Sequence, residues 1–514
     1  MRSKTFLVWL FAAYGCALLA VAVYFRHALN VDAVAYLRIA HYYATGNMSL
    51  ALSGYWSPLA SWVMAPLLAL GLPPLVVARG FMAGSALVFL WGCLAVFRAL
   101  QLPPKWTLTG AVLAALAGVY WSVQFITPDL LVSGIIGLAF NRVRAAQAGK
   151  SALLFAIAGL LWGLAYLAKA VAFPLTILFL LAMGLAQARK TSFAMALRSF
   201  GLVILGFAVL AGPWVLTLSI KYGRPTFSTT TTITHSLTGP PDIPRYHPFG
   251  RTLHHPEPGR ITSWEEPSRM AYANWSPFES TAYAIHQVRV VVKNLGTCVA
   301  LVTSLNLFWL VLPVAGALYA VRHRRLPDWA RPLLVPALLV FIYLPCFVTI
   351  TEQRFFYPAL PFLFSSLALW ATSNAPREKT AWWLTLAGGL APILAAVVVI
   401  GARPKIAGEC AADIAQRLEH AGIAGPVVGS AMLPGGRTGL YVAYLLNQQW
   451  YGDAPELTPS QIEGSGARLV MVHRGSELDV RLAASESFTN LAPKIFPDGA
   501  TAERCPVAVY ERRL

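Results

Sequence analysis

The sequence has few charged residues for its length. Only 12% of its residues are charged and 57% are hydrophobic, whereas soluble domains carry about 25% charged residues. This composition excludes an ordinary soluble domain and predicts a protein with many membrane spans. The charges are also unbalanced, with 40 Lys and Arg against 22 Asp and Glu. The basic residues lie between apolar segments and form no cluster with aromatics, which argues against nucleic acid as a partner.

Paired cysteine motifs and glycine-rich phosphate loops are also missing. The six cysteines include no CxxC pair, which argues against a cysteine-based zinc site. Pro434, Gly435 and Gly436 predict a turn rather than a phosphate-binding loop. Cys410 and Cys505 flank a polar C-terminal region, and outside the cytoplasm they could form a disulfide. The sequence leaves two unrelated thiols as an equal alternative.

Apolar windows of roughly 20 residues predict about eleven transmembrane helices. We therefore expect a mainly α-helical, polytopic membrane protein with a small C-terminal α/β domain. The first apolar run is too long for the core of a signal peptide and is expected to remain as a span. The predicted spans are 6–25, 78–98, 106–125, 129–141, 152–169, 171–187, 197–219, 296–320, 332–350, 356–372 and 381–401.

The composition changes after the last of these spans, which predicts two units. Residues 1–402 are expected to form the transmembrane module, with outer loops at 26–77 and 220–295. Residues 403–514 are expected to form the α/β domain. Its predicted strands are 427–430, 469–472 and 505–511, and its predicted helices are 411–421 and 439–446.

The placing of Lys and Arg predicts the orientation, because cytoplasmic loops carry more of both. The N-terminus and every second loop hold most of them. The first outer loop, the 220–295 loop and the C-terminal domain are therefore expected on the other side. In the first outer loop, residues 33–43 and 58–75 predict short helices at the membrane interface. The short loops of that outer side hold only Arg26, Arg38, Arg79, Lys169 and Arg354.

Two aspartates are the strongest candidates for chemistry. Asp32 follows the first span, where an isolated charge is expensive unless it is used. Asp129 follows the turn 126–128 on the same predicted side of the membrane. Together they could act on a hydroxyl group or hold a divalent metal ion. The alternative is that each aspartate only caps the N-terminus of the helix that follows it.

Two basic residues on the same outer side are candidates for binding a phosphate group. Lys169 lies at the outer end of a predicted span, and Arg354 lies in the segment 351–358. A lysine supplies a point charge and an arginine a planar fork of donors. The alternatives are a snorkelling lysine at a helix end and an Arg354–Glu352 ion pair.

Aromatic and polar residues of the outer loops are candidates for contacts with the acceptor or the sugar. The alternative is simple packing of these loops on the membrane face. If a metal ion binds, its candidate ligands are Asp32, Asp129 and His235, and its presence stays open. The contact candidates are Tyr36, Tyr55, Trp56, His235, Trp264, Glu265 and Trp275.

Several short motifs occur in one order along the chain. Asp32 with Tyr36 is followed by Tyr55-Trp56-Ser57-Pro58, Thr127-Pro128-Asp129, Lys169, Gly212-Pro213-Trp214, and Arg354 with Tyr357-Pro358. This series resembles the GT-C glycosyltransferases, in particular protein O-mannosyltransferase-like enzymes and lipid A aminoarabinose transferases. The resemblance covers about residues 5–370, and it depends on the order of the motifs and on their common side of the membrane.

The resemblance implies a hexosyl- or pentosyltransferase that uses a polyprenyl-phosphate-linked sugar. The acceptor would be a lipid, glycan or protein hydroxyl outside the cytoplasm, and transfer would invert the anomeric carbon. The protein would lie in a bacterial inner membrane with its site facing the periplasm. Asp32 would be the essential loop aspartate, with Lys169 and Arg354 on the phosphate. Some relatives carry an acidic metal ligand where this chain has Trp56-Ser57, so metal dependence stays open.

A polytopic lipid or glycan transporter or flippase is the alternative function. Transporters often show inverted repeats and polar groups near the bilayer midplane. This sequence shows no clear internal repeat, and its candidate charges gather on one side of the membrane. Both features favour the enzyme.

Overall fold

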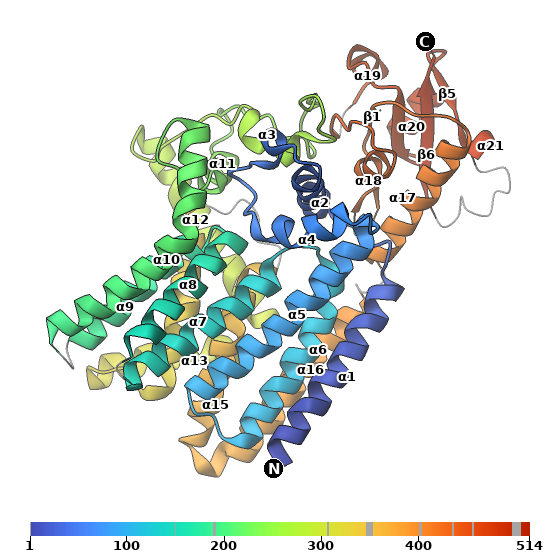
Figure 1. The fold of residues 1–514 in the computed structure, drawn as a ribbon. Coiled ribbons are helices and arrows are strands. Elements are labelled where there is room, and N and C mark those ends of the chain that lie inside the picture. The colour runs from blue at the N-terminus through green and yellow to red at the C-terminus, as the bar shows by residue number, and fades with distance from the viewer. Residues whose placement is uncertain are drawn as a thin grey trace.

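The structure is a computed structural model in which a bundle of long helices carries a smaller layer at one end (Figure 1). The N-terminus lies at the far end of the bundle, and the C-terminal strands lie beside the outer layer. The described residues are 2–149, 151–188, 192–305, 308–345, 353–399, 403–433, 436–454, 457–495 and 505–513.

Five of the described helical segments are long and apolar enough to cross a membrane. They are Thr5–Tyr24 in α1 (Arg2–Tyr24), α5 (Pro74–Ala99), α6 (Pro104–Gln124), α10 (Phe193–Tyr222), and Gln353–Thr372, which joins η4 (Gln353–Ala359) to α15 (Leu360–Thr372). The remaining bundle helices are α7 (Asp129–Gly149), α8 (Ala152–Ala168), α9 (Ala172–Ala188), α12 (Thr281–Leu305), α13 (Phe308–His323), α14 (Leu334–Tyr343) and α16 (Glu378–Val399). The polytopic helical fold predicted from the sequence is confirmed.

Some helix ends differ from the apolar windows. The helix α7 extends to Gly149, beyond the predicted end at 141, because polar residues continue it past the apolar stretch. The helix α12 begins at Thr281, within the segment predicted as an outer loop. Its first turns carry polar residues that are held by neighbouring segments. His286 bonds to the carbonyl of Thr238 at 2.7 Å, for example. Residues 346–350 of one predicted span lie outside the described part.

Small residues let the bundle helices approach one another closely. At Gly134 of α7, an added Cβ atom would lie 2.3 Å from the carbonyl oxygen of Val88 in α5. At Gly159 of α8, it would lie 2.2 Å from the carbonyl oxygen of Val203 in α10. Such close backbone contact is typical of helices packed in a membrane. This close packing fixes the positions of α7 and α8, whose outer ends carry Asp129 and Lys169.

An outer layer of short elements covers one end of the bundle. It contains α2 (Val31–Ala44), α3 (Met48–Ala51), α4 (Leu59–Ala69), α11 (Thr230–Leu237), η1 (Ser263–Glu265) and η2 (Pro267–Arg269). The predicted helix at 33–43 is confirmed as α2. The predicted helix at 58–75 ends at Ala69, and Pro74 starts α5. A proline is tolerated at a helix start because its missing N–H would have no partner there.

The C-terminal part contains a four-stranded sheet of order β1-β4-β6-β5. The strands β1 (Val427–Val428) and β4 (Leu469–His473) are parallel, and β6 (Val507–Arg512) is antiparallel to both β4 and β5 (Phe488–Asn490). A hairpin of β2 (Met432–Leu433) and β3 (Gly436–Arg437) leads into α18 (Thr438–Leu445). The other helices there are α17 (Arg403–His420), α19 (Pro459–Gly464), α20 (Glu477–Ala483) and α21 (Ala492–Ile495).

A disulfide joins Cys410 of α17 to Cys505, just before β6, and the two cysteines are 95 positions apart in the sequence. The sequence left this bond open, and the structure decides it. Both cysteines are buried, so the bond ties the long helix to the sheet from within.

We expect the double substitution of Cys410 and Cys505 by serine to destabilise the C-terminal part. Closing a loop of this length stabilises a fold by about 2–5 kcal/mol, mainly by restricting the unfolded chain. Guanidinium unfolding of the purified protein, followed by far-UV circular dichroism, measures the loss. Serine at Cys16, an exposed free thiol, is the control and should leave the transition unchanged. Equal transitions for all three proteins would contradict a stabilising role.

The C-terminal part packs on the outer layer through backbone contacts. The carbonyl of Ile261 accepts from the backbone N–H of Trp450 at 2.7 Å, and the N–H of His254 donates to Tyr451 at 2.6 Å. In α17, a Cβ atom at Gly408 would lie 1.8 Å from the His27 carbonyl oxygen, so only glycine fits there. These contacts hold the β2–β3 hairpin over the end of the bundle.

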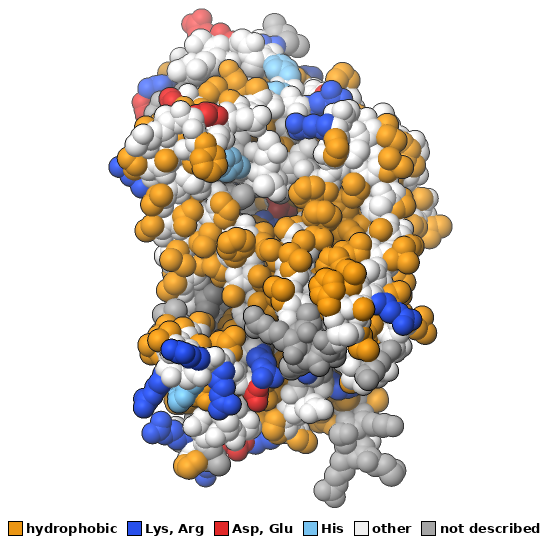
Figure 2. Space-filling model, turned by 90° about the vertical axis from the view of Figure 1, so that its left-hand side faces the viewer, with side chains coloured by type: hydrophobic (Ala, Val, Ile, Leu, Met, Phe, Trp, Pro, Cys, Tyr) orange, Lys and Arg blue, Asp and Glu red, His pale blue; other side chains and the backbone are white. Residues whose placement is uncertain are grey.

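The surface divides into zones (Figure 2). On the face shown, a broad belt of hydrophobic side chains crosses the molecule, and Lys and Arg gather below it, at the end away from the outer layer. Arg322, in the last turn of α13, and Arg324 and Arg325, which follow the helix, are exposed. The orientation expected from the sequence would place this basic end in the cytoplasm.

Candidate active site

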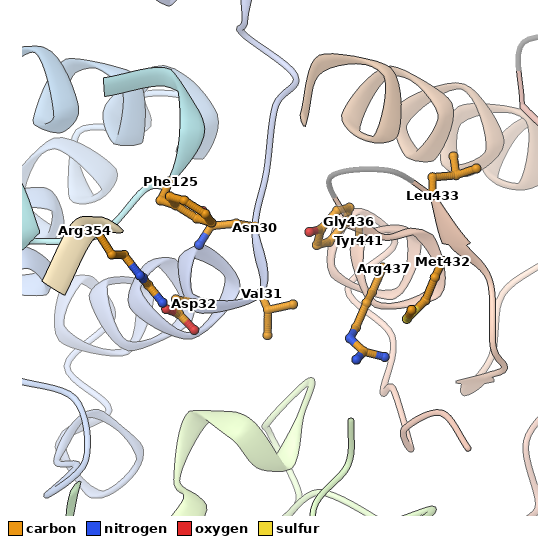
Figure 3. Close-up of a pocket in the computed structure, with 10 residues that line it drawn as sticks. All are labelled: Asn30, Val31, Asp32, Phe125, Arg354, Met432, Leu433, Gly436, Arg437 and Tyr441. Carbon is orange, nitrogen blue, oxygen red and sulfur yellow. The ribbon is translucent and has the colours of Figure 1, made fainter. Parts of the chain in front are cut away.

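A cavity of about 260 Å³ lies between the outer end of the bundle and the C-terminal part (Figure 3). Four distant parts of the chain build it: the start of α2, the end of α6, η4, and the β2–β3 hairpin with α18. Both charged and apolar side chains face it. The lining residues are Asn30, Val31, Asp32, Phe125, Met432, Leu433, Gly436, Arg354, Arg437 and Tyr441.

Asp32 and Arg354 meet in this cavity. The Arg354 guanidinium donates to the Asp32 carboxylate at 2.7 Å, although the two residues are 322 positions apart in the sequence. The two side chains are only 18% and 12% exposed. The first turn of α2 holds Asp32, and the guanidinium lies over the rings of Phe125 and Phe355 at 5.0 and 5.2 Å. The alternative partner of Arg354, Glu352, lies outside the described residues.

Asp129 and Lys169 form a second ion pair behind the first. The Lys169 ammonium group donates to one Asp129 oxygen. The other Asp129 oxygen lies 3.9 Å from the Arg354 guanidinium. Asp129 is the first residue of α7, and Lys169 directly follows α8. The ammonium group is 4.5 Å from the centre of the Phe355 ring and therefore does not snorkel freely into water.

These four side chains form one row of alternating charges, in the order Lys169, Asp129, Arg354 and Asp32. Their formal charges cancel. Each cation already contacts a carboxylate, so an entering phosphate must compete for it. Asp32 is more exposed than Asp129, at 18% against 4%. Asp32 is therefore the carboxylate that a phosphate group can most readily displace from Arg354.

Trp264 of η1 contributes the second hydrogen bond to Asp32. Its indole N–H lies 3.4 Å from the Asp32 oxygen that does not bind Arg354. Trp264 is in turn packed edge-on against Phe249 and His247. Burial lowers the pKa of His247 to about 4, so this ring is neutral near pH 7. The outer loop thus places the uncharged indole N–H of Trp264 beside Asp32, the candidate base.

We expect Trp264→Phe to lower the rate of sugar transfer about two- to tenfold without unfolding the protein. The phenyl ring keeps most of the packing but cannot donate to Asp32, and a hydrogen bond of this kind contributes about 0.5–1.5 kcal/mol. Turnover at saturating donor measures the effect. The control is Trp382→Phe, which removes a 2.7 Å bond to Thr109 between bundle helices. Full activity of the Trp264 variant would contradict the positioning of Asp32 by its indole.

The other aromatics of the first outer loop form a packed cluster beside Asp32. The ring of Trp56 lies 4.9 Å from both Tyr36 and Tyr55, and its N–H donates to the Trp264 carbonyl at 2.7 Å. Burial, followed by the nearby Asp32 charge, raises the pKa of Tyr36, so its hydroxyl stays protonated. Tyr36 and Trp56 are buried and shape the wall, whereas Tyr55 is half-buried. None of the three lines the cavity.

Glu265 is enclosed by the outer layer. It is fully buried, and its oxygens accept from the Tyr42 hydroxyl at 2.5 Å and from the backbone N–H groups of Ile261 and Thr262 at 2.8 and 3.0 Å. Burial raises the pKa of this carboxyl group. Its contacts fix η1, and therefore Trp264, on α2. This arrangement supports a structural role rather than contact with a sugar.

His235 and Trp275 lie together in a separate cluster. Their rings stack at 4.4 Å, and the indole N–H donates to the His235 carbonyl at 2.8 Å. The His235 ring bonds to Gln287, and neither His235 nor Trp275 lines the cavity. No three His, Cys, Asp or Glu side chains in the described ranges are arranged to hold a metal ion. The described donor set does not fit a metal centre of Asp32, Asp129 and His235.

No sequence pattern indicated the opposite wall of the cavity. Met432, Leu433, Gly436, Arg437 and Tyr441 all come from the C-terminal part. They reach the site only because the β2–β3 hairpin packs over the bundle, which no local pattern could reveal. Asn30 and Phe125 were also missed, although each lies within four residues of a candidate aspartate.

Arg437 is fixed on this wall by the 220–295 segment. It forms an ion pair with Asp453, and its guanidinium lies 5.0 Å from the Phe249 ring. The Asp453 carboxylate also accepts from the Gly250 backbone at 2.5 Å. Because Phe249 packs on Trp264, a continuous set of contacts leads from Arg437 to Asp32.

No family model matches the sequence, and no curated protein matches it significantly. Among solved structures, the chain is similar to ArnT from Cupriavidus metallidurans bound to undecaprenyl phosphate. The similarity has a TM-score of 0.56 and 15% identity, and covers 99% of this chain and 98% of that chain. The predicted GT-C fold is confirmed by this similarity over nearly the full length of both chains.

Weaker similarities extend to two other proteins. The apo oligosaccharyltransferase of Archaeoglobus fulgidus has a TM-score of 0.43 at 12% identity, covering 90% of this chain and 69% of that chain. The arabinofuranosyltransferase AftD from Mycobacteria has a TM-score of 0.43 at 14% identity, covering 98% of this chain and 40% of that chain.

Proposed function

We propose that this protein is a membrane glycosyltransferase. It moves a sugar from a polyprenyl-phosphate donor to an acceptor hydroxyl on the outer side of a bacterial inner membrane, facing the periplasm. The observation that carries the proposal is the contact between Asp32 and Arg354 in a cavity at the membrane-facing base of the outer layer. A carboxylate and a phosphate-binding cation are the two groups that this transfer requires.

The position of the cavity suits a donor of this kind. The isoprenoid tail stays in the bilayer while the phosphate and sugar extend to the end of the bundle. Figure 3 shows Arg354 and Asp32 on one side of the cavity and the residues of the C-terminal part on the other. The similar ArnT structure is bound to undecaprenyl phosphate, which supports the same class of carrier here.

The row of charges suggests how the reaction starts. The donor phosphate binds Arg354 and, behind it, Lys169. Arg354 then turns from Asp32 toward the phosphate, which frees the carboxylate. Donor binding thereby produces the free base that the next step requires, and the base stays masked while the site holds no donor.

The transfer is a single displacement with inversion. The acceptor hydroxyl gives its proton to Asp32, and its oxygen forms a bond to the anomeric carbon. The bond from that carbon to the phosphate oxygen breaks, and its electron pair stays on the phosphate. The leaving polyprenyl phosphate gains one negative charge, which Arg354 and Lys169 stabilise. No step requires a metal ion.

The test uses the purified protein in lipid nanodiscs with radiolabelled undecaprenyl-phosphate sugars. Membranes from the source organism, inactivated by heat, supply the acceptor. We expect label to move from the donor into the acceptor fraction, and undecaprenyl phosphate alone to inhibit. Absence of both transfer and undecaprenyl-phosphate binding would contradict the proposal. The transporter alternative predicts instead that labelled lipid changes leaflet without loss of its sugar.

A further inference from the structure

Asn30 occupies the N-cap of α2 but does not use its side chain as a cap. An asparagine in this position normally accepts a hydrogen bond from the next turn of its own helix. Here its amide oxygen accepts instead from the backbone N–H of Ile126, at 2.8 Å. The bond joins the start of α2, which carries Asp32, to the loop that leads into Asp129.

This bond fixes which way the amide faces. A backbone N–H only donates, so the oxygen of Asn30 must face Ile126, and the amide nitrogen must face away from it. In Figure 3 this nitrogen points toward the side of Arg354 and Asp32, and Asn30 is one of the residues that line the cavity. Within the described part of the chain, the nitrogen has no hydrogen-bond partner. The amide therefore presents two free donors to whatever enters.

The surroundings indicate which ligand these donors meet. Asn30 lines the bundle side of the cavity with Phe125, and the Arg354 guanidinium lies over the Phe125 ring at 5.0 Å. The proposed leaving phosphate binds at this guanidinium. The charges of Lys169, Asp129, Arg354 and Asp32 already cancel. A neutral N–H donor therefore adds a hydrogen bond to the phosphate without changing the net charge of the site. Phosphate oxygens are strong acceptors for such a donor.

We infer that Asn30 is a further donor-binding residue whose amide NH₂ group hydrogen-bonds to the phosphate of the polyprenyl-phosphate substrate. This inference rests on the proposed function. The bond strengthens as charge develops on the leaving phosphate, so Asn30 contributes to both binding and turnover. The alternative is that Asn30 only ties two loops together through Ile126.

Two substitutions separate these roles. Asn30→Asp keeps an oxygen for the Ile126 N–H but removes the NH₂ donors. Asn30→Ala removes both the oxygen and the donors without adding charge. The matched control is Asn490→Asp in β5, where the amide oxygen accepts from the Ala492 N–H at the same 2.8 Å. Asn490 is exposed and lies outside the cavity.

The measurements are the unfolding temperature of the full-length protein and its affinity for undecaprenyl phosphate in detergent. A hydrogen bond to a charged group corresponds to a factor of about ten or more in affinity. We expect Asn30→Asp and Asn30→Ala to weaken binding by at least that factor, and the Asn30→Asp protein to unfold at the wild-type temperature. The Asn490→Asp protein should match wild type in both measurements.

The other possible results distinguish an error about Asn30 from an error about the proposed function. If Arg354→Met weakens binding but either Asn30 variant binds as wild type does, the role of Asn30 is wrong and the proposed function stands. If the two Asn30 variants lose affinity only in proportion to lost folded protein, Asn30 is a structural tie. If the wild-type protein does not bind undecaprenyl phosphate at all, the proposed function fails, and this inference fails with it.

Discussion

Asp32→Asn is expected to reduce sugar transfer by roughly 10²- to 10⁴-fold, the usual contribution of a general base. The amide fills the same space but cannot take the acceptor proton. Because the amide is neutral, Arg354 also loses its charged partner at 2.7 Å. Undecaprenyl phosphate should therefore bind this variant at least as tightly as it binds wild type.

This combination separates a base from a merely structural carboxylate. Transfer rates with labelled donor and binding of undecaprenyl phosphate are measured on the same preparation. The control is Asp328→Asn, which breaks an ion pair of the same 2.7 Å length to Arg331, where the aspartate side chain is 85% exposed. Full transfer activity in Asp32→Asn would contradict the base role. Loss of both binding and folded protein would assign Asp32 to the scaffold.

Arg354→Met is expected to weaken undecaprenyl-phosphate binding about 10- to 150-fold. The range follows from the 1.5–3 kcal/mol that a hydrogen bond to a charged group contributes. Turnover should fall further, because the same guanidinium stabilises the charge that develops on the leaving phosphate. Arg354→Lys should fall between wild type and Arg354→Met, since lysine keeps the charge but not the planar fork.

The control for this series is Arg331→Met, at the exposed Asp328 pair. Isothermal titration with undecaprenyl phosphate measures the affinity, and labelled donor measures turnover. We expect Arg331→Met to match wild type in both. Equal affinity of Arg354→Met and wild type would show that the phosphate binds elsewhere. Lys169 would then be the next cation to test.

The residues of the charged row were predictable because each carries a signal in its own segment. Asp32 and Asp129 are charges at the ends of apolar runs, and Lys169 and Arg354 are basic residues on the side that carries few of them. The resemblance to GT-C enzymes supplied their order. What the sequence could not supply was their pairing, in which Arg354 contacts both aspartates and Lys169 binds Asp129.

The candidates for acceptor and sugar contacts show that residue type alone does not predict which side chains face the cavity. Glu265 and Trp275 have the chemistry of sugar-binding residues, but folding surrounds both with protein partners. Their neighbours come from segments far away in the sequence, so their burial could not be predicted. The predicted span 296–320 begins later than α12 for a simpler reason. Polar residues such as Asn294 interrupt the apolar window although the helix continues through them.

The contribution of the C-terminal part to the cavity could not be predicted from the sequence. Its strands and helices were largely predictable, because short apolar runs such as 469–472 mark buried strands. Its role was not, since Arg437 and Tyr441 become part of the cavity only through long-range packing. The Cys410–Cys505 bond likewise follows from how α17 lies against the sheet.

The most direct test of the whole account is a cryo-EM structure of the protein with undecaprenyl phosphate bound. We predict the phosphate in the cavity of Figure 3, within hydrogen-bonding distance of the Arg354 guanidinium, with Asp32 released from its ion pair. A phosphate at the basic far end of the bundle, or one bound outside with the Asp32–Arg354 pair intact, would contradict it.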